Sequence, residues 1–157
     1  MLALVKLADG TELTTHQTFL EPDGSGKARI DRARLVAAGA SPAGGGVWFG
    51  EPDPEREFLV AEGLESLLSA LRIFGVTAGC AALSAIGVRR LILPPEARKV
   101  RIFADHDELG QGLVAAREAR WRWRSEGRAV AISRAENVGE DANDVWMRMR
   151  KKAEALG

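Results

Sequence analysis

The chain has 157 residues and a formal net charge of zero, with 22 basic (Lys and Arg) and 22 acidic side chains. This length suits one well-buried domain with a small appendage, and the balanced charge excludes a strongly basic coat protein for nucleic acid. The single cysteine, Cys80, excludes an internal disulfide and a cysteine-rich zinc ribbon. The apolar segments of the chain are too short for a signal peptide or a membrane span, so we expect a cytoplasmic protein with no membrane partner.

The first part of the chain is rich in short apolar segments separated by glycine turns. Three segments predict strands: residues 2–7, 13–20 and 47–49. Asp9-Gly10 follows the first of them and predicts a hairpin. Residues 31–38 predict a short helix with Asp31 as its cap. We expect residues 1–55 to form a small β-rich N-terminal subdomain.

From residue 56 onward, strand-like and helix-like segments alternate. Strands are predicted at 58–61, 76–83, 100–104 and 129–133, and helices at 64–74, 84–91, 108–126 and 141–155. This alternation is typical of an α/β fold in which helices cover both faces of a parallel sheet. Ligands bind such sheets at the carboxyl ends of the strands. We therefore predict a second domain over residues 56–157, with its site at that edge.

Two aspartates separated by one residue, Asp105 and Asp107, follow the predicted strand at 100–104. Side chains at i and i+2 of an extended chain point to the same side, so both carboxylates could converge on a hard cation such as Mg²⁺. The alternative is an N-cap for the next helix, a role that one of the two acids would fill. His106 lies between them and points to the other side, where we expect it to pack or to face the substrate.

Acidic residues also follow two other predicted strands. Glu62 comes directly after residues 58–61, where its charge could instead interact favourably with the positive end of a helix dipole. Asp141 opens the last helix, and Asn143 and Asp144 could cap that helix and orient the neighbouring ligands. Carboxylates gathered at one sheet edge repel one another unless a cation offsets their charge. The three clusters together predict a metal-dependent reaction on an anionic substrate.

The order of these motifs resembles the Toprim family, which includes primases, topoisomerases and some nucleases. The resemblance rests on Glu62-Gly63, on Asp105-His106-Asp107 and on the later Asp141, and it is greatest to primases and primase-helicases of phages and plasmids. Similar segments occur at residues 16–20, 23–28, 61–66, 81–85, 104–110 and 139–145. The resemblance thus covers nearly the whole chain. It implies a Toprim-like, Rossmann-type parallel sheet flanked by helices, behind a small β-rich subdomain.

The resemblance implies phosphoryl-transfer chemistry that uses Mg²⁺ or Mn²⁺. Asp105 and Asp107 would hold the ion, and Asp141 would complete a second metal site. Glu62 would be either a metal ligand or the general base that activates the attacking hydroxyl. The implied enzyme is a primase, a DNA-directed RNA polymerase of DNA replication. Its partners would be a single-stranded DNA template and nucleoside triphosphates.

Two further functions fit the same motifs. One is a Toprim-type phosphodiester nuclease, and the other is a non-catalytic accessory domain that binds nucleotide or metal in a replication protein. The sequence contains no tyrosine, which excludes topoisomerase chemistry by this chain. It shows no zinc-binding module and no helicase part, so a helicase or template-binding partner would come from another chain or another region. Glu140 stands where many similar proteins have a lysine, which would weaken contact with nucleotide phosphates.

Basic residues at two places are candidates for contact with nucleotide or nucleic acid. Lys27 and Arg29 lie in a glycine-rich loop, and His16 could join them, although an ordinary polar hairpin loop is an equal alternative. The helix after the two aspartates alternates arginines with Trp121 and Trp123, a combination that can bind phosphates and stack on bases. We favour an amphipathic helix with solvated arginines there, because their spacing scatters them around the helix axis.

Overall fold

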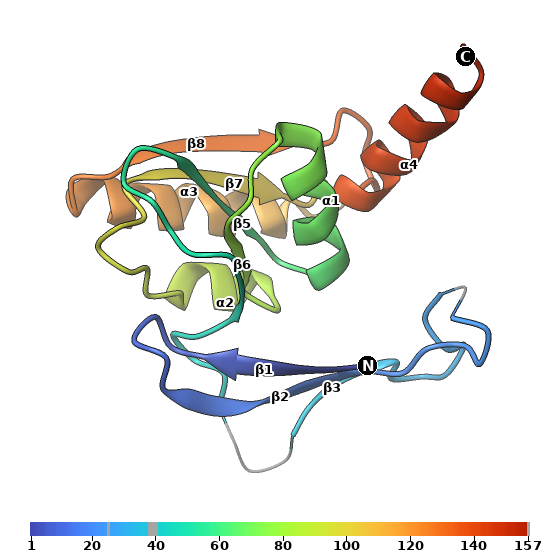
Figure 1. Ribbon diagram of the computed structural model, residues 1–157, viewed down its shortest axis with the longest axis horizontal. Coiled ribbons are helices and arrows are strands. Elements are labelled where there is room, and N and C mark those ends of the chain that lie inside the picture. The colour runs from blue at the N-terminus through green and yellow to red at the C-terminus, as the bar shows by residue number, and fades with distance from the viewer. Residues whose placement is uncertain (25, 38–40, 157) are drawn as a thin grey trace.

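The computed structural model describes residues 1–24, 26–37 and 41–156. It contains a small three-stranded sheet and a five-stranded sheet that has helices on both faces (Figure 1). No helix in these ranges is long and apolar enough to cross a membrane.

The small sheet is antiparallel and is built from the N-terminal part of the chain. Its strands, in the order β1-β2-β3, are β1 (Leu2–Lys6), β2 (Glu12–Thr18) and β3 (Arg34–Val36). The predicted hairpin is confirmed at its turn, where Gly10 has a φ of 87° and the Asp9 carboxylate accepts a hydrogen bond from the Thr11 amide. A positive φ of this kind is one that glycine adopts without steric cost.

The helix predicted at 31–38 is wrong over its described part. Arg34–Val36 is instead the strand β3, and its register places Val36 opposite His16 and Arg34 opposite Thr18. Hydrogen bonding to the free edge of β2 outweighs the weak local preference for helix, as is common for short segments. Residue 38, the last of the predicted helix, lies outside the described ranges.

The large sheet has the strand order β4-β6-β5-β7-β8. Its strands are β4 (Val47–Phe49), β5 (Glu57–Ala61), β6 (Gly79–Ala81), β7 (Lys99–Ala104) and β8 (Ala129–Arg134). The helices are α1 (Leu64–Phe74), α2 (Ala85–Arg90), α3 (Gln111–Ser125) and α4 (Ala142–Glu154). The strands β5 to β8 are parallel, as predicted, and β4 is antiparallel to β6 at one edge.

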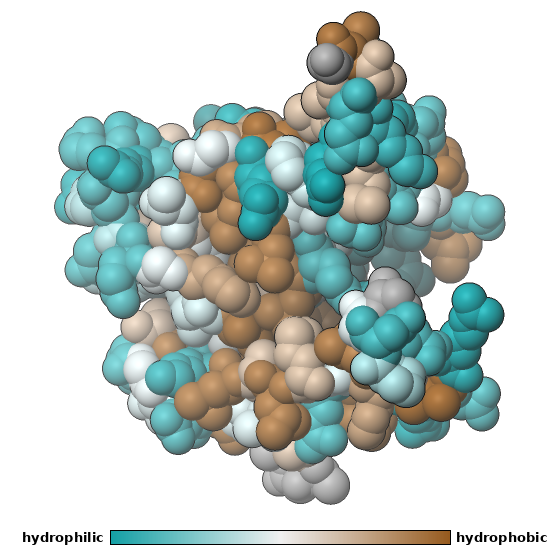
Figure 2. Space-filling view, turned by 45° about the vertical axis from the view of Figure 1, so that its right-hand side comes forward, coloured by the Kyte–Doolittle hydropathy of each residue, from teal (hydrophilic) through white to brown (hydrophobic). Residues whose placement is uncertain are grey.

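The strand β4 corrects one detail of the predicted organisation. Sequence analysis places residues 47–49 in the small N-terminal subdomain, but β4 pairs with β6 of the large sheet. The two sheets meet beside this strand, where Lys6 forms a bridge with Gly46 and its carbonyl accepts a hydrogen bond from the Trp48 indole at 2.8 Å. Figure 2 shows hydrophobic side chains gathered through the centre of one face, between hydrophilic outer parts.

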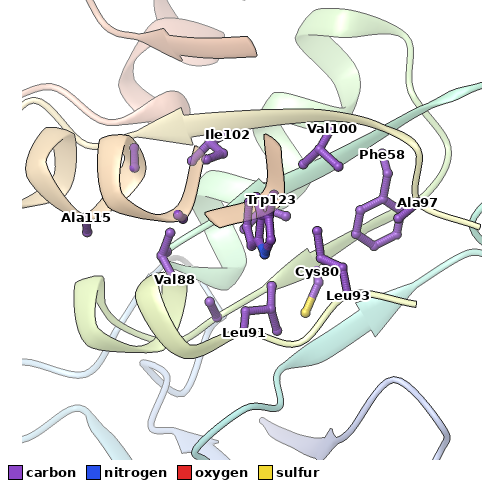
Figure 3. Close-up of a cluster of buried hydrophobic side chains, with 14 of the residues drawn as sticks. Phe58, Cys80, Val88, Leu91, Leu93, Ala97, Val100, Ile102, Ala115 and Trp123 are labelled. Atoms are coloured by element: carbon purple, nitrogen blue, oxygen red, sulfur yellow. The ribbon is translucent and has the colours of Figure 1, made fainter. Parts of the chain in front are cut away.

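Two apolar layers hold the helices against the large sheet. On one face, α2 and α3 cover a cluster that includes Val88, Leu91 and Trp123, and the fully buried Trp123 lies among its other side chains (Figure 3). On the other face, α1 and α4 cover a second cluster that includes Leu67 and Ala142. Burial of a large side chain in such a layer contributes about 1.5–3 kcal/mol relative to leaving it exposed.

Candidate metal centre

The exits of β5 and β7, which are neighbours in the sheet, bring Glu62 and Asp105 to the start of α3. A methyl group placed on Gly112 would lie 2.9 Å from Oε1 of Glu62 and 2.7 Å from the carbonyl oxygen of Asp105. The two acids thus meet across a glycine that leaves room for both. Together with Asp107 and Glu108 they line an open hollow at this edge. In Figure 1 the arrowheads of β7 and β8 point to this side of the molecule.

The environment of this edge disfavours the charged forms of two carboxyl groups. Burial, then the charges of Asp105 and Asp107, raise the pKa of Glu62 to about 7. Burial, then the charge of Asp141, raise the pKa of Asp105 to about 6, while Arg34 acts in the opposite direction. Oδ1 of Asp105 is buried and has no hydrogen-bond partner among the described residues. An unpartnered buried carboxylate oxygen is the donor that a cation needs.

Asp107 occupies a different position from that pair. Its two carboxylate oxygens accept hydrogen bonds from the amides of Gln111 at 3.0 Å and Gly112 at 2.8 Å. These bonds hold the pKa of Asp107 below its usual value. Asp107 therefore caps α3, which is the alternative role that the sequence left open. Each carboxylate oxygen keeps a further lone pair, so the cap does not prevent Asp107 from binding an ion.

Asp141 is the N-cap of α4. Its Oδ1 accepts from the amides of Asn143 at 2.8 Å and Asp144 at 3.1 Å, and Asp144 completes a capping box by accepting from the Asp141 amide. Hydroxyl groups of α1 hold the same turn, because Ser66 donates to Asp141 and Ser69 donates to Asn143. Asp144 thus takes part in the cap of α4, and the Asn143 side chain is held by Ser69.

His106 lies between the two aspartates and contacts the end of β8. Its Nδ1 lies 3.0 Å from the Ala135 carbonyl, and its Nε2 lies 3.3 Å from the Arg134 guanidinium. Its main chain also exchanges hydrogen bonds with Gly139 and Glu140. These contacts agree with the packing role expected for His106, and they fix the loop before α4 against the exit of β7.

The residues at this edge fit a divalent-metal site of one particular kind. Within the described residues, no group of three His, Cys, Asp or Glu side chains is arranged to hold an ion by itself. Mg²⁺ keeps several waters and commonly binds through one or two carboxylates together with substrate phosphates. Asp105, with its unpartnered oxygen, and the adjacent acids supply that number of carboxylates.

Basic side chains from the N-terminal part of the chain reach the start of α1. Nζ of Lys27 lies 3.4 Å from one carboxylate oxygen of Glu65, and Arg34 donates to the other at 2.8 Å. Arg34 also lowers the pKa of Asp105. Sequence analysis missed Arg34, because its place depends on the pairing of β3 with β2 rather than on any local motif. Lys27 and Arg34 therefore lie beside the acidic edge, and Arg89 of α2 acts on Glu62 from another side.

The other predicted contacts lie in different settings. His16 is buried in β2, and burial, then the charge of Arg34, hold its pKa below the usual value. Arg29 lines a separate hollow with Glu21, whose carboxylate accepts a hydrogen bond from the Arg29 amide. Glu140 forms an ion pair with Arg148.

The chain matches a known family in sequence and solved structures in fold. Residues 57–151 match the family model described as the Toprim domain, whereas no curated protein matches the sequence. The fold is similar to that of the DnaG primase catalytic domain bound to ssDNA (TM-score 0.58, 15% identity) and of the DnaG catalytic core (0.56, 16%). It is also similar to that of the E. coli primase catalytic core (0.50, 16%).

The extent of these structural matches is the same in each case. They cover 98% of this chain but only 50% of the solved one, so the chain spans about half the length of those cores. At these identities the likeness shows the fold, and it confirms the predicted α/β class with a separate small sheet.

Proposed function

The chain belongs to the Toprim family, and from that premise we propose that it transfers nucleotides in a metal-dependent reaction of the primase type. The reaction would be DNA-templated synthesis of an RNA primer. The observation that carries the proposal is the pair Glu62 and Asp105, two acids with raised pKa values that meet at one sheet edge, one of them with an unpartnered oxygen.

The acids have distinct roles in this proposal. Asp105 and Asp107 bind Mg²⁺ or Mn²⁺, and Asp141, whose charge acts on Asp105, completes a second site. Such ions would offset the carboxylate charges and stabilise the charge that develops on the reacting phosphate. Asp107 carries out its part while it caps α3, which fixes the direction of its carboxylate.

Glu62 has two roles open to it. With a pKa of about 7, its carboxylate can accept a proton from a 3′-hydroxyl group near neutral pH, which is the property of an effective general base. As a metal ligand it would instead stay ionised beside the cation. The two roles differ in the effect of Glu62→Gln: loss of a base lowers the rate but leaves metal affinity intact, whereas loss of a ligand lowers both.

The proposed partners are a single-stranded DNA template and nucleoside triphosphates. One solved relative in fold is a primase domain bound to ssDNA, which supports the template. Lys27, whose ammonium group lies beside Glu65 next to the acidic edge, supports a phosphate contact. Arg29 and His16 belong to the same proposed surface, although His16 is buried in the present arrangement. A helicase or template-binding partner and a cytoplasmic location are further parts of the proposal.

An assay of products tests this function. The protein is incubated with single-stranded DNA, labelled ribonucleotides and Mg²⁺ or Mn²⁺, and both RNA and DNA are resolved by size. We expect short RNA products that disappear in Asp105→Asn and persist in Asp31→Asn, a matched change at an exposed aspartate.

Each other result contradicts the primase proposal in a specific way. Shortened DNA without RNA would identify a Toprim-type nuclease, which uses the same acids with water as the nucleophile. Metal binding without either product would identify a non-catalytic accessory domain. RNA synthesis that survives in Asp105→Asn would place the chemistry elsewhere in the chain.

A further inference from the structure

A second surface with the chemistry of a nucleic-acid contact lies on the outer face of α3. Trp121 is 77% exposed there, and a shallow hollow around it is lined by Arg117, Arg120 and Arg124. We call these four residues the α3 outer patch. Several other large apolar side chains are also exposed, and what distinguishes Trp121 is the group of arginines that lines the hollow around its ring.

Helical geometry collects the patch on one side of α3. Arg117, Trp121 and Arg124 follow one another at spacings of four and three residues, which places them on the same face of a helix. Arg120 lies at the edge of that face. The expectation that the arginines scatter around the axis is thus wrong for Arg117, Arg120 and Arg124. Trp123 points the other way and packs in the core.

The arginines of this region divide into two groups by their contacts. Arg122 donates to the Leu91 carbonyl, and Arg128 donates to three carbonyls in the segment before β7, so both hold the fold together. In the described part of the chain, no ion pair or hydrogen bond is formed by the side chains of the three patch arginines. The patch therefore presents three unpaired cations around a flat apolar ring.

A ligand that matches this surface has a specific chemistry. Guanidinium groups bind phosphates through several donors, and an indole ring stacks on an unpaired base of any sequence. An acidic peptide would satisfy the charges but would leave the exposed face of Trp121 without a matching surface. We propose that the α3 outer patch binds single-stranded nucleic acid, with Trp121 stacked on a base and the three arginines on phosphates.

The patch lies apart from the acidic edge but on the same helix. Gly112 touches the catalytic acids, and Trp121 follows nine residues later, a distance of about 14 Å along the helix axis. Nine residues also turn the helix by about 180°, so the patch faces away from the acidic edge, and a strand that contacts both must pass around α3. The inference deepens the proposed function and rests on it, because only that function identifies the bound strand as the template.

Binding without metal tests the patch separately from catalysis. The affinity for a fluorescent oligodeoxythymidylate is measured by anisotropy in EDTA over a series of salt concentrations. We expect Trp121→Ala to weaken binding about tenfold and Trp121→Phe to keep most of the affinity. Replacement of the three arginines by glutamine should lower the slope of log K against log salt by about 2.

The control variant removes the same number of charges from another helix, by glutamine replacement of Arg148, Arg150 and Lys151 of α4. Since the altered side chains are exposed, or partly exposed in the case of Arg120, thermal unfolding should show that each variant folds. Equal weakening by the control would mean that only net charge matters and would overturn the proposal. So would unchanged affinity in Trp121→Ala, equal affinity for duplex DNA, or full displacement of the oligonucleotide by an acidic peptide. The patch inference and the catalytic proposal fail independently. A patch variant that loses oligonucleotide binding but still makes RNA separates them, and so does a protein that binds the oligonucleotide through the patch but makes no RNA.

Discussion

Glu62 is held where its neutral form is favoured, and this has a measurable cost in stability. Its pKa is raised from 4.5 to about 7 in the folded chain, so the folded state binds more protons than the unfolded state between these values. The free energy of unfolding therefore falls as the pH rises through this window, and the cost is complete above pH 7. Stability therefore does not explain an acid at this position.

Replacement of Glu62 by glutamine should remove that cost. We expect Glu62→Gln to be more stable than the wild type at pH 8, by about 1–3 kcal/mol, and to differ little at pH 4.5. Urea unfolding at both pH values in EDTA measures the difference. Glu136→Gln, a change at an exposed glutamate, serves as the control and should show no such pH dependence. An equal effect of Glu62→Gln at both pH values would show that repulsion and burial are not the cause.

Asp107 combines a structural and a proposed metal-binding role, which two substitutions can separate. Asparagine keeps an oxygen that can accept the amides of α3, whereas alanine loses the cap at a cost of about 1 kcal/mol. We expect Asp107→Asn to unfold in EDTA near the wild-type temperature but to lose the stabilisation by Mg²⁺, which at 100 times Kd amounts to about 2.7 kcal/mol. Thermal scans with and without Mg²⁺ check this. A full Mg²⁺ response in Asp107→Asn would remove Asp107 from the ligand set.

At the scale of elements, local signals predicted the α/β part well and the small sheet less well. The predicted helix at 64–74 has the bounds of α1, because its apolar spacing is regular and Gly75, with a φ of 64°, ends it. The helix predicted from residue 108 begins only at Gln111, because the residues before it form the turn that Asp107 caps. The strand β3 was missed because it exists only through its pairing with β2.

The close contact of α3 with the strand exit depends on Gly112. A Cβ atom there would lie 2.7 Å from the Asp105 carbonyl and 2.9 Å from the Glu62 carboxylate, so Gly112→Ala must displace the helix or the acids. We expect a loss of about 1–3 kcal/mol in the free energy of unfolding and a lower affinity for Mg²⁺. Gly26→Ala is the control, since a Cβ at Gly26 meets nothing within 4 Å. Wild-type stability and metal affinity in Gly112→Ala would show that the helix and the acids are not coupled.

At the scale of the whole molecule, sequence topology predicted which acids meet but not how they are oriented. Carboxyl ends of neighbouring parallel strands share an edge, which is why Glu62 and Asp105 could be placed together without a structure. The direction of the Asp107 and Asp141 carboxylates depends on helix starts whose hydrogen bonds a sequence does not specify. Arg34, which acts on Asp105, comes from the small sheet, whose position follows only from the packing of both parts.

Arg34 links the two parts of the molecule, because it belongs to β3 of the small sheet and acts on Asp105 of the large one. Burial raises the pKa of Asp105, and the charge of Arg34 partly reverses that effect. Since Asp105 must lose its proton to bind an ion, Arg34→Gln should move the pH midpoint of Mg²⁺ binding upward. Titration calorimetry at a series of pH values measures the midpoint. Arg32→Gln, at an exposed neighbouring arginine, should leave it in place, and a midpoint that stays fixed in Arg34→Gln would show that the small sheet does not tune the acidic edge.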